Sequence, residues 1–193
     1  RNRRAMYRAE EKRNQMKAGD NTDTVEFLKK CHLRLELFTP TSESEILRCY
    51  ELVVRTNQLN MSGNKYTEEE FAAVLSRPGH RNVAFSCEDD FGGYGIVGFG
   101  QYKVEDSELV FTEFAMSCRV AGKYVESAFF AALLSAENCE NGRFSVQKTK
   151  KNILLRRTLE EIGFRTESDS DNRVDYSFDS ALKERELVIV SKK

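Results

Sequence analysis

The sequence predicts an α/β domain whose central sheet is mixed but mostly antiparallel and is flanked by helices. Segments with alternating apolar side chains, typical of half-buried strands, are interspersed with segments whose apolar residues recur every three or four positions, typical of helices. With 193 residues, the chain has the length of one domain with a single sizeable core. Charged residues make up 32% and hydrophobic residues 40%, which is the composition of an ordinary soluble domain.

The N-terminal segment differs from the rest in composition. Residues 1–18 are rich in arginine and lysine and contain few apolar side chains. We therefore expect residues 1–23 to be a basic linker or solvated helix, and residues 24–193 to be the folded domain. A nucleic-acid-binding arm is the alternative for this segment, but the aromatic residues expected of one are nearly absent. A short helix is expected over Thr24–Lys30.

The first strand is predicted at Leu33–Leu37, where apolar and charged residues alternate strictly. After Pro40, either Ser42 or Ser44 can cap a helix whose apolar stripe ends at Val54.

An amide-rich stretch over residues 55–63 predicts a loop, which could be a turn whose Asn side chains cap its own backbone.

Thr67 and Glu70 form a capping box that starts the next helix. Residues 167–172 are acidic and predict a loose segment. The other expected elements are strands over 82–87, 95–104 and 108–118, a helix over 123–138, a strand over 144–147, a helix over 152–161, and strands over 174–178 and 187–189.

The joint between the 109–118 strand and the following helix is the most informative stretch. A short polar turn, Arg119–Lys123, connects them, and the helical period starts at Tyr124. The first N–H groups of a helix have no intrahelical partner, and the helix dipole adds positive charge there. The turn therefore predicts an anion site, to which Arg119 and Lys123 add full charges.

Arg119-x-x-Gly122-x-Tyr124 resembles the Arg/Gln-x-x-Gly-x-Gly/Ala pyrophosphate loop of the GNAT acyl-CoA N-acyltransferase fold, with a tyrosine in place of the last small residue. The longer string Ser117-Cys118-Arg119-Val120-x-Gly122 resembles the C-terminal GNAT-like domain of FkbH-like proteins, of HAD subfamily IIIC. The resemblance spans roughly residues 24–164. Three further stretches agree in order and spacing: Arg55–Asn60, Gly93–Gly98, and Lys151-Asn152 followed by Ile162–Phe164.

This resemblance implies an acyltransferase domain that handles an acyl or glyceryl thioester on CoA or on the phosphopantetheine arm of an acyl-carrier protein, in polyketide biosynthesis of the methoxymalonyl type. It implies two partners, an acyl-carrier protein and a HAD-type domain of the same protein. Residues 1–23 would then be the linker from that domain, and the chain a fragment. Two alternatives remain: a non-catalytic carrier-protein docking module, and a stand-alone acetyl-CoA-dependent N-acetyltransferase.

The resemblance also implies site residues. The 55–63 loop would line the acceptor side of the cleft, with Arg55, Asn57, Gln58 and Asn60 as substrate-binding residues. A pantetheine arm, which is peptide-like, would pair with the exposed edge of the 109–118 strand where it diverges from the 144–147 strand. The cofactor-binding residues would be Met116, Cys118, Arg119, Val120, Ala121, Gly122, Lys123, Tyr124 and Asn152.

Two residues are candidates for catalysis. GNAT enzymes often place a tyrosine acid seven residues after the asparagine, but that position is Leu159 here. Glu113 could act as a base, or it could be a solvent-facing member of its strand. Cys118 lies beside Arg119 and ahead of a helix, which favours a reactive thiolate that could hold an acyl group. Free cysteines are also often buried as small hydrophobic residues, and that alternative stays open.

Composition excludes several other classes. A net charge of −1 gives no reason to expect nucleic acid or membrane as a partner. Five cysteines without a CxxC pair are typical of reduced thiols in the cytoplasm. With only two histidines and no metal-ligand spacing, we expect no metal in this domain.

Overall fold

The computed structural model describes residues 30–182 and 188–192, together with Arg8, Ala9, Glu11, Lys12, Glu26 and Leu28. The expected basic linker at residues 1–23 lies almost wholly outside the described residues. Of the expected helix at Thr24–Lys30, the described residues Glu26, Leu28 and Lys30 are helical.

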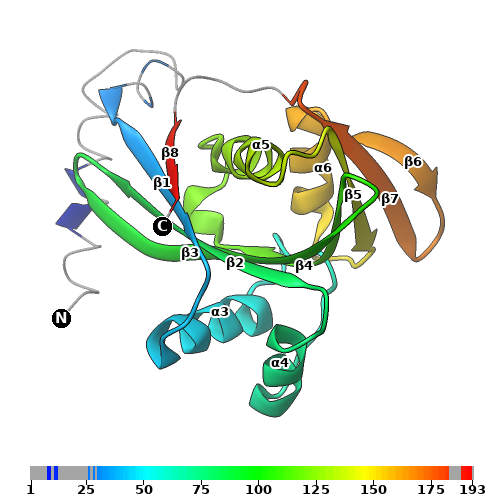
Figure 1. Ribbon diagram of the computed structural model, residues 1–193. Coiled ribbons are helices and arrows are strands. Elements are labelled where there is room, and N and C mark those ends of the chain that lie inside the picture. Colours follow the sequence, from blue (N-terminus) through cyan, green and yellow to red (C-terminus); the bar gives the residue numbers. More distant parts are fainter. Residues whose placement is uncertain are drawn as a thin grey trace.

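One mixed sheet organises the described part of the chain (Figure 1). Its eight strands lie in the order β6-β7-β5-β4-β3-β2-β1-β8. The pairs β4/β5 and β1/β8 are parallel and the others are antiparallel, so the predicted sheet is confirmed. The strands are β1 (Leu33–Phe38), β2 (Arg81–Asp89), β3 (Gly92–Glu105), β4 (Glu108–Met116), β5 (Asn141–Gln147), β6 (Arg165–Asp169), β7 (Arg173–Asp179) and β8 (Val188–Lys192).

Helices cover both faces of this sheet, α5 and α6 on one side and α3 and α4 on the other (Figure 1). The larger part of the core lies under α5 and α6, and phenylalanine rings in mutual contact fill it. A smaller core under α3 and α4 contains Val53, Phe71 and Phe99. The helices are α3 (Glu43–Arg55), α4 (Glu68–Leu75), α5 (Val125–Glu137) and α6 (Ile153–Ile162).

The two helix starts on the α3/α4 side follow from their caps. Ser42 caps α3 with Glu45, and Thr67 caps α4 with Glu70; both are reciprocal capping boxes. The predicted box at Thr67 is confirmed, and Ser42 rather than Ser44 is the cap of α3.

A β-bulge in β4 determines on which side of the sheet its side chains lie. Gln101 pairs with Glu113 and Tyr102 with Phe111, so Thr112 is the extra residue. The bulge lets Phe111 and Phe114, three positions apart, both reach the core under α5. It also turns Glu113 toward the α3/α4 side, where it meets Ser62 and Tyr66.

Two expected elements are wrong at their ends. The strand over 108–118 stops at Met116, and Cys118–Val120 form a short 3₁₀ helix, η1. Residues 167–169, expected to be loose, belong to the edge strand β6 and pair with β7. All five residues of β6 are exposed, so this strand has no buried face to produce an apolar alternation.

Candidate functional site

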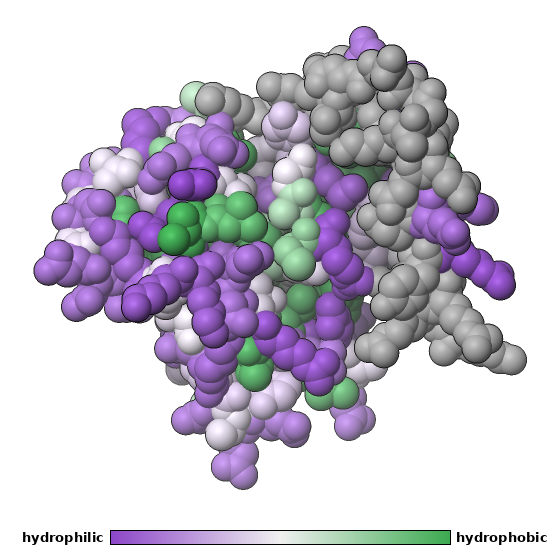
Figure 2. All heavy atoms as spheres, turned by 180° about the vertical axis from the view of Figure 1, so that it is seen from behind, coloured by the Kyte–Doolittle hydropathy of each residue, from purple (hydrophilic) through white to green (hydrophobic). Residues whose placement is uncertain are grey.

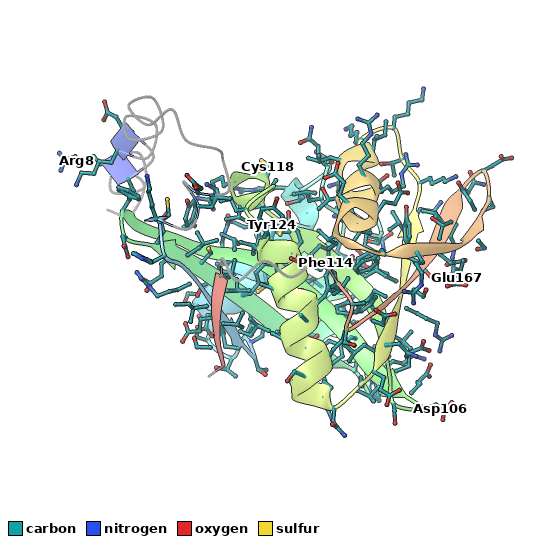
Figure 3. The ribbon with its side chains drawn as sticks, turned by 90° about the horizontal axis from the view of Figure 1, so that it is seen from above. Arg8, Asp106, Phe114, Cys118, Tyr124 and Glu167 are labelled. Carbon is teal, nitrogen blue, oxygen red and sulfur yellow. The ribbon has the colours of Figure 1, made fainter. Side chains whose placement is uncertain are left out.

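The chain between β4 and α5 is a compact turn. The N–H groups of Val120, Ala121 and Lys123 donate to backbone oxygens three positions earlier, those of Ser117, Cys118 and Val120, at 3.2–3.3 Å. Several of the amide donors expected to face an anion are therefore used within the turn itself. Figure 3 shows Cys118 and Tyr124 at one end of α5, with the Asp106 hairpin at the opposite end.

Tyr124 takes a left-handed backbone conformation, with φ 62° and ψ 15°. Gly122, two residues earlier, also has a positive φ of 70°. The resembled loop has a small residue where this chain has Tyr124, and glycine adopts such a conformation without steric cost. The ammonium of Lys123 lies 5.5 Å from the centre of the Tyr94 ring, a cation–π contact with β3.

A cavity of about 630 Å³ opens beside this turn. It brings Cys118 together with three of the four predicted substrate-binding residues, Arg55, Asn57 and Gln58. Its walls come from α3, the loop after α3, the start of η1 and the segment before α6. The lining residues are Arg48, Glu51, Leu52, Arg55, Thr56, Asn57, Gln58, Leu59, Ser117, Cys118, Lys150 and Lys151.

The cavity wall is strongly basic. Two arginines and two lysines line it against one acidic residue, Glu51. Glu51 pairs with Arg48 at 3.0 Å and with Arg55 at 3.3 Å. Lys150 and Lys151 are exposed and come from the segment before α6. Sequence reasoning missed these two lysines and Arg48, because only the fold brings their segments together.

Cys118 is an exposed residue, whereas the other four cysteines are buried. The alternative in which Cys118 is a buried small hydrophobic residue is therefore wrong. The reason is the early end of β4: once the chain leaves the sheet at Met116, η1 turns its first residue toward the cavity.

Asn60 is fully buried and serves the loop itself. Its side-chain nitrogen donates to the Val53 oxygen at 2.8 Å and to the Thr56 oxygen at 3.2 Å. Its side-chain oxygen accepts from the N–H of Gly63 at 2.7 Å. Asn60 therefore caps its own loop, as in the alternative of a self-capped turn. Arg55, Asn57 and Gln58 line the cavity instead.

The edge of β4 is not open where a pantetheine arm was expected to pair. β4 and β5 pair only at residues 108–110 and 141–143, so the two strands diverge beyond that point. The chain's own loop fills the gap: Met61 N–H donates to the Phe114 oxygen and Met116 N–H donates to the Leu59 oxygen, both at 2.9 Å. The expectation of an exposed edge at 114–116 is wrong.

The side chain of Asn152 joins three segments next to this edge of β4: the 59–61 loop, the end of β5 and the start of α6. Its side-chain nitrogen donates to the backbone oxygens of Asn60 (3.2 Å) and Gln147 (2.8 Å), and its side-chain oxygen accepts from Thr149 N–H (3.0 Å). It is fully buried. Asn152 therefore holds the loop, the end of β5 and the start of α6 together.

Glu113 is 1% exposed, so the solvent-facing alternative is wrong. Its carboxylate accepts from the hydroxyls of Ser62 (2.8 Å) and Tyr66 (2.7 Å). Burial raises the pKa of Glu113, and the hydrogen bonds from Tyr66 and Ser62 oppose that rise. Burial and the neighbouring carboxylate raise the pKa of Tyr66 to about 12. Glu113 does not line the cavity that holds Cys118.

Leu159, at the position where GNAT enzymes often place a tyrosine acid, is buried in the core and 1% exposed.

Within the described ranges, no three His, Cys, Asp or Glu side chains gather so as to hold a metal ion. In the same part of the chain, no helix has the length and apolar character to cross a bilayer. On the face seen in Figure 2, hydrophilic side chains predominate and hydrophobic ones form small groups.

No protein-family model matches the chain, and no curated protein sequence matches it. Solved structures do. An acetyltransferase from Thermus thermophilus gives a TM-score of 0.58 at 16% identity, covering 77% of this chain and 99% of that one. The GNAT domain of S. lividans PAT gives 0.53 at 15% identity, covering 75% and 89%. The ribosomal-protein-S18-alanine N-acetyltransferase from Escherichia coli gives 0.51 at 12% identity, covering 79% and 97%.

At such low identity, these likenesses establish the fold alone. The chain has the GNAT acetyltransferase-like fold, and this prediction is confirmed.

Proposed function

We propose that this chain is the GNAT-like acyltransferase domain of an FkbH-like protein, and that it moves an acyl or glyceryl thioester between pantetheine thiols. The carrier would be CoA or an acyl-carrier protein, in biosynthesis of the methoxymalonyl type. The observation that carries the proposal is that Cys118, an exposed cysteine, lines the basic cavity together with Arg55, Asn57 and Gln58. The fold supports acyl transfer in general terms.

The chemistry is thioester exchange. The Cys118 thiolate attacks the carbonyl carbon of the bound thioester, the carbon–sulfur bond to pantetheine breaks, and a new carbon–sulfur bond forms to Sγ. The leaving pantetheine thiolate takes the electron pair and is later protonated by water. A second pantetheine thiolate reverses the step. Because a thiolate is a stable leaving group near neutral pH, neither step requires a strong acid.

The charge of the cavity favours an anionic reactant over an amine. Arg48, Arg55, Lys150 and Lys151 outnumber Glu51, so a carboxylate or phosphate is attracted and an ammonium ion is repelled. The groups that would serve amine acetylation are not supplied either: Glu113 lies outside the cavity, and the position of the usual tyrosine acid is Leu159, which is buried in the core. These observations count against the stand-alone N-acetyltransferase.

The second candidate is a non-catalytic module that docks the carrier protein. It is favoured by the loop at 59–61, which already occupies the β4 edge that a pantetheine arm would use. The HAD-type domain would then perform the chemistry alone. The two candidates differ in whether acylated carrier requires this chain's cavity.

Mass spectrometry of a reconstituted reaction separates these functions. The reaction contains the HAD-type domain, a three-carbon acyl phosphate donor and a carrier protein, with and without this chain. Acyl transfer by this chain requires that acylated carrier falls when the chain is omitted or carries Cys118→Ala. An unchanged yield with Cys118→Ala would favour the docking module, and rapid acetylation of a panel of amines would favour the N-acetyltransferase.

A further inference from the structure

The first turn of α6 presents two adjacent apolar side chains to solvent, Ile153 (44% exposed) and Leu154 (38%). The opposite face of the helix is buried through Leu155, Leu159 and Ile162, so the core does not require this pair. Of the large hydrophobic side chains that are exposed among the described residues, only these two are consecutive. Single exposed apolar residues are ordinary, whereas a contiguous apolar group with a polar rim is typical of an interaction site.

Three cations flank this apolar pair. Lys150 and Lys151 precede it and also line the cavity that contains Cys118. Arg157 is exposed and follows the pair by three and four positions, which places it on the same side of the helix. Within the part of the chain that the structure describes, none of the three cations forms an ion pair. Their charges are therefore available to a partner.

The charge at this helix start is opposite to that of the other described helices. In α3, α4 and α5 the first turn contains acidic residues, such as the buried Glu126 of α5, which suit the partial positive charge of a helix N-terminus. In α6 the first turn contains none, and two lysines stand just before its N-cap. Cations at this end of a helix disfavour the fold by itself and favour a bound anionic group.

The cavity and the first turn of α6 form one continuous basic region, because the two lysines belong to both. A partner that covers the apolar pair therefore lies at the edge of the cavity and can place an attached group beside Cys118. A phosphopantetheine arm is joined to its carrier protein by a phosphodiester, which puts a negative charge where the arm leaves the protein. Opposite charges then meet at the lysines while the arm enters the cavity.

We propose that Lys150, Lys151, Ile153, Leu154 and Arg157, here called the α6 surface, are the docking site for an acyl-carrier protein with acidic side chains around its arm. The apolar pair packs against the carrier, and the cations pair with the phosphodiester and the acidic side chains. The identity of the partner as a carrier protein rests on the proposed function. The α6 surface serves equally whether the cavity transfers the acyl group or this chain only docks the carrier.

The test is isothermal titration calorimetry of the full chain with a holo acyl-carrier protein, whose arm ends in a free thiol, so that binding is measured without acyl transfer. One variant, Ile153→Ser with Leu154→Ser, removes the apolar pair, and a second, Arg157→Glu, reverses a charge outside the cavity. The controls are Val104→Ser and Lys103→Glu, an exposed apolar residue and its neighbouring lysine on β3, outside the cavity.

Both variants of the α6 surface should bind the carrier about tenfold more weakly than the wild type, since a few buried contacts dominate an interface. Both controls should bind as the wild type does, and high salt should weaken the wild type more than Arg157→Glu. Equal affinity of the wild type and both surface variants overturns the proposal, as does a wild type that does not bind the carrier. Self-association that Ile153→Ser with Leu154→Ser abolishes, without carrier binding, would instead assign the surface to a second copy of the chain.

A small acyl-pantetheine thioester separates docking from the proposed reaction, because it carries no protein. Ile153→Ser with Leu154→Ser should acquire the acyl group from it as the wild type does. Carrier binding that depends on the α6 surface, with no acyl group on Cys118 of the wild type, would contradict only the proposed transfer. An acyl group on Cys118, with carrier affinity unchanged in both surface variants, would contradict only the docking site.

Discussion

The side-chain amide of Asn152 donates to the backbone oxygen of Asn60, 3.2 Å away, across 92 positions of sequence. The bond links the start of α6 to the loop that carries Asn57 and Gln58 into the cavity. The same amide binds the Gln147 oxygen at the end of β5. One buried side chain thus fixes both the loop and its distance from the lysines before α6.

Replacing Asn152 with alanine should therefore destabilise the domain. The substitution leaves the buried carbonyl oxygen of Asn60 and the partly buried one of Gln147 without their donor. A buried group that loses its partner costs about 1–3 kcal/mol. Urea unfolding followed by circular dichroism measures the change, with the exposed Asn141→Ala as the matched control. A change in unfolding free energy no larger than that of the control would show that Asn152 does not hold these segments.

Glu126 should make the stability of the domain depend on pH. Its pKa is about 7 in the folded chain, above the ordinary value of 4.5 expected in the unfolded chain, mainly because of burial. Between these values the folded chain binds more protons than the unfolded chain, so stability decreases as pH rises from about 4.5 to about 7. Above that window the buried charge costs on the order of 3 kcal/mol.

Glu126→Gln should remove this cost, so the variant should have a higher melting temperature than the wild type at pH 8. The difference should shrink toward pH 5, where Glu126 is protonated in the folded chain. Calorimetric melting at several pH values measures both. A wild type that is as stable as Glu126→Gln at pH 8 would show that the carboxylate is accommodated without penalty.

Tyr124 should carry a backbone cost that glycine does not. A left-handed conformation costs an L-residue roughly 1–2 kcal/mol. Comparing Tyr124→Gly with Tyr124→Ala isolates this term, because both variants lose the same ring. The glycine variant should be the more stable by about 1 kcal/mol in urea unfolding. If the alanine variant is equally stable, the conformation at residue 124 is not strained.

The lysines before α6 should select an anionic acyl donor. Reversing both charges with Lys150→Glu and Lys151→Glu should raise KM for that donor about tenfold, with little change in stability because both side chains are exposed. Lys103→Glu, on β3 and outside the cavity, is the control. High salt should weaken binding to the wild type more than to the double variant. Equal KM values would mean that the cavity charge does not recognise the donor.

Much of the fold could be predicted from local patterns. Leu33–Leu37 alternates because one face of β1 is buried, and Thr67 with Glu70 marks a helix start by itself. The bulge at Thr112 could not be predicted, because it depends on how β4 pairs with β3. It is this bulge that places Glu113 on the α3/α4 side of the sheet, beside Ser62 and Tyr66.

The site was also predictable only in part, because some of its contacts depend on pairing between distant segments. The motif indicated the turn, and Arg55, Asn57 and Gln58 do share a cavity with Cys118. The pairing of the 59–61 loop with β4 is a contact between distant segments that no local pattern encodes. The role of Asn60 within its loop was one of two open alternatives, and its burial decides between them.

The most direct test of the proposed thioester exchange is intact-protein and peptide mass spectrometry of the chain after brief incubation with an acyl-pantetheine thioester. The expected result is a single hydroxylamine-sensitive acyl adduct on the peptide containing Cys118. It should be absent in Cys118→Ala and transferred to a second carrier thiol on chase. Cys139→Ser, at a cysteine outside the cavity, should leave the adduct unchanged. Acylated carrier that forms at the wild-type rate with Cys118→Ala, and no adduct on the wild type, would contradict the proposal.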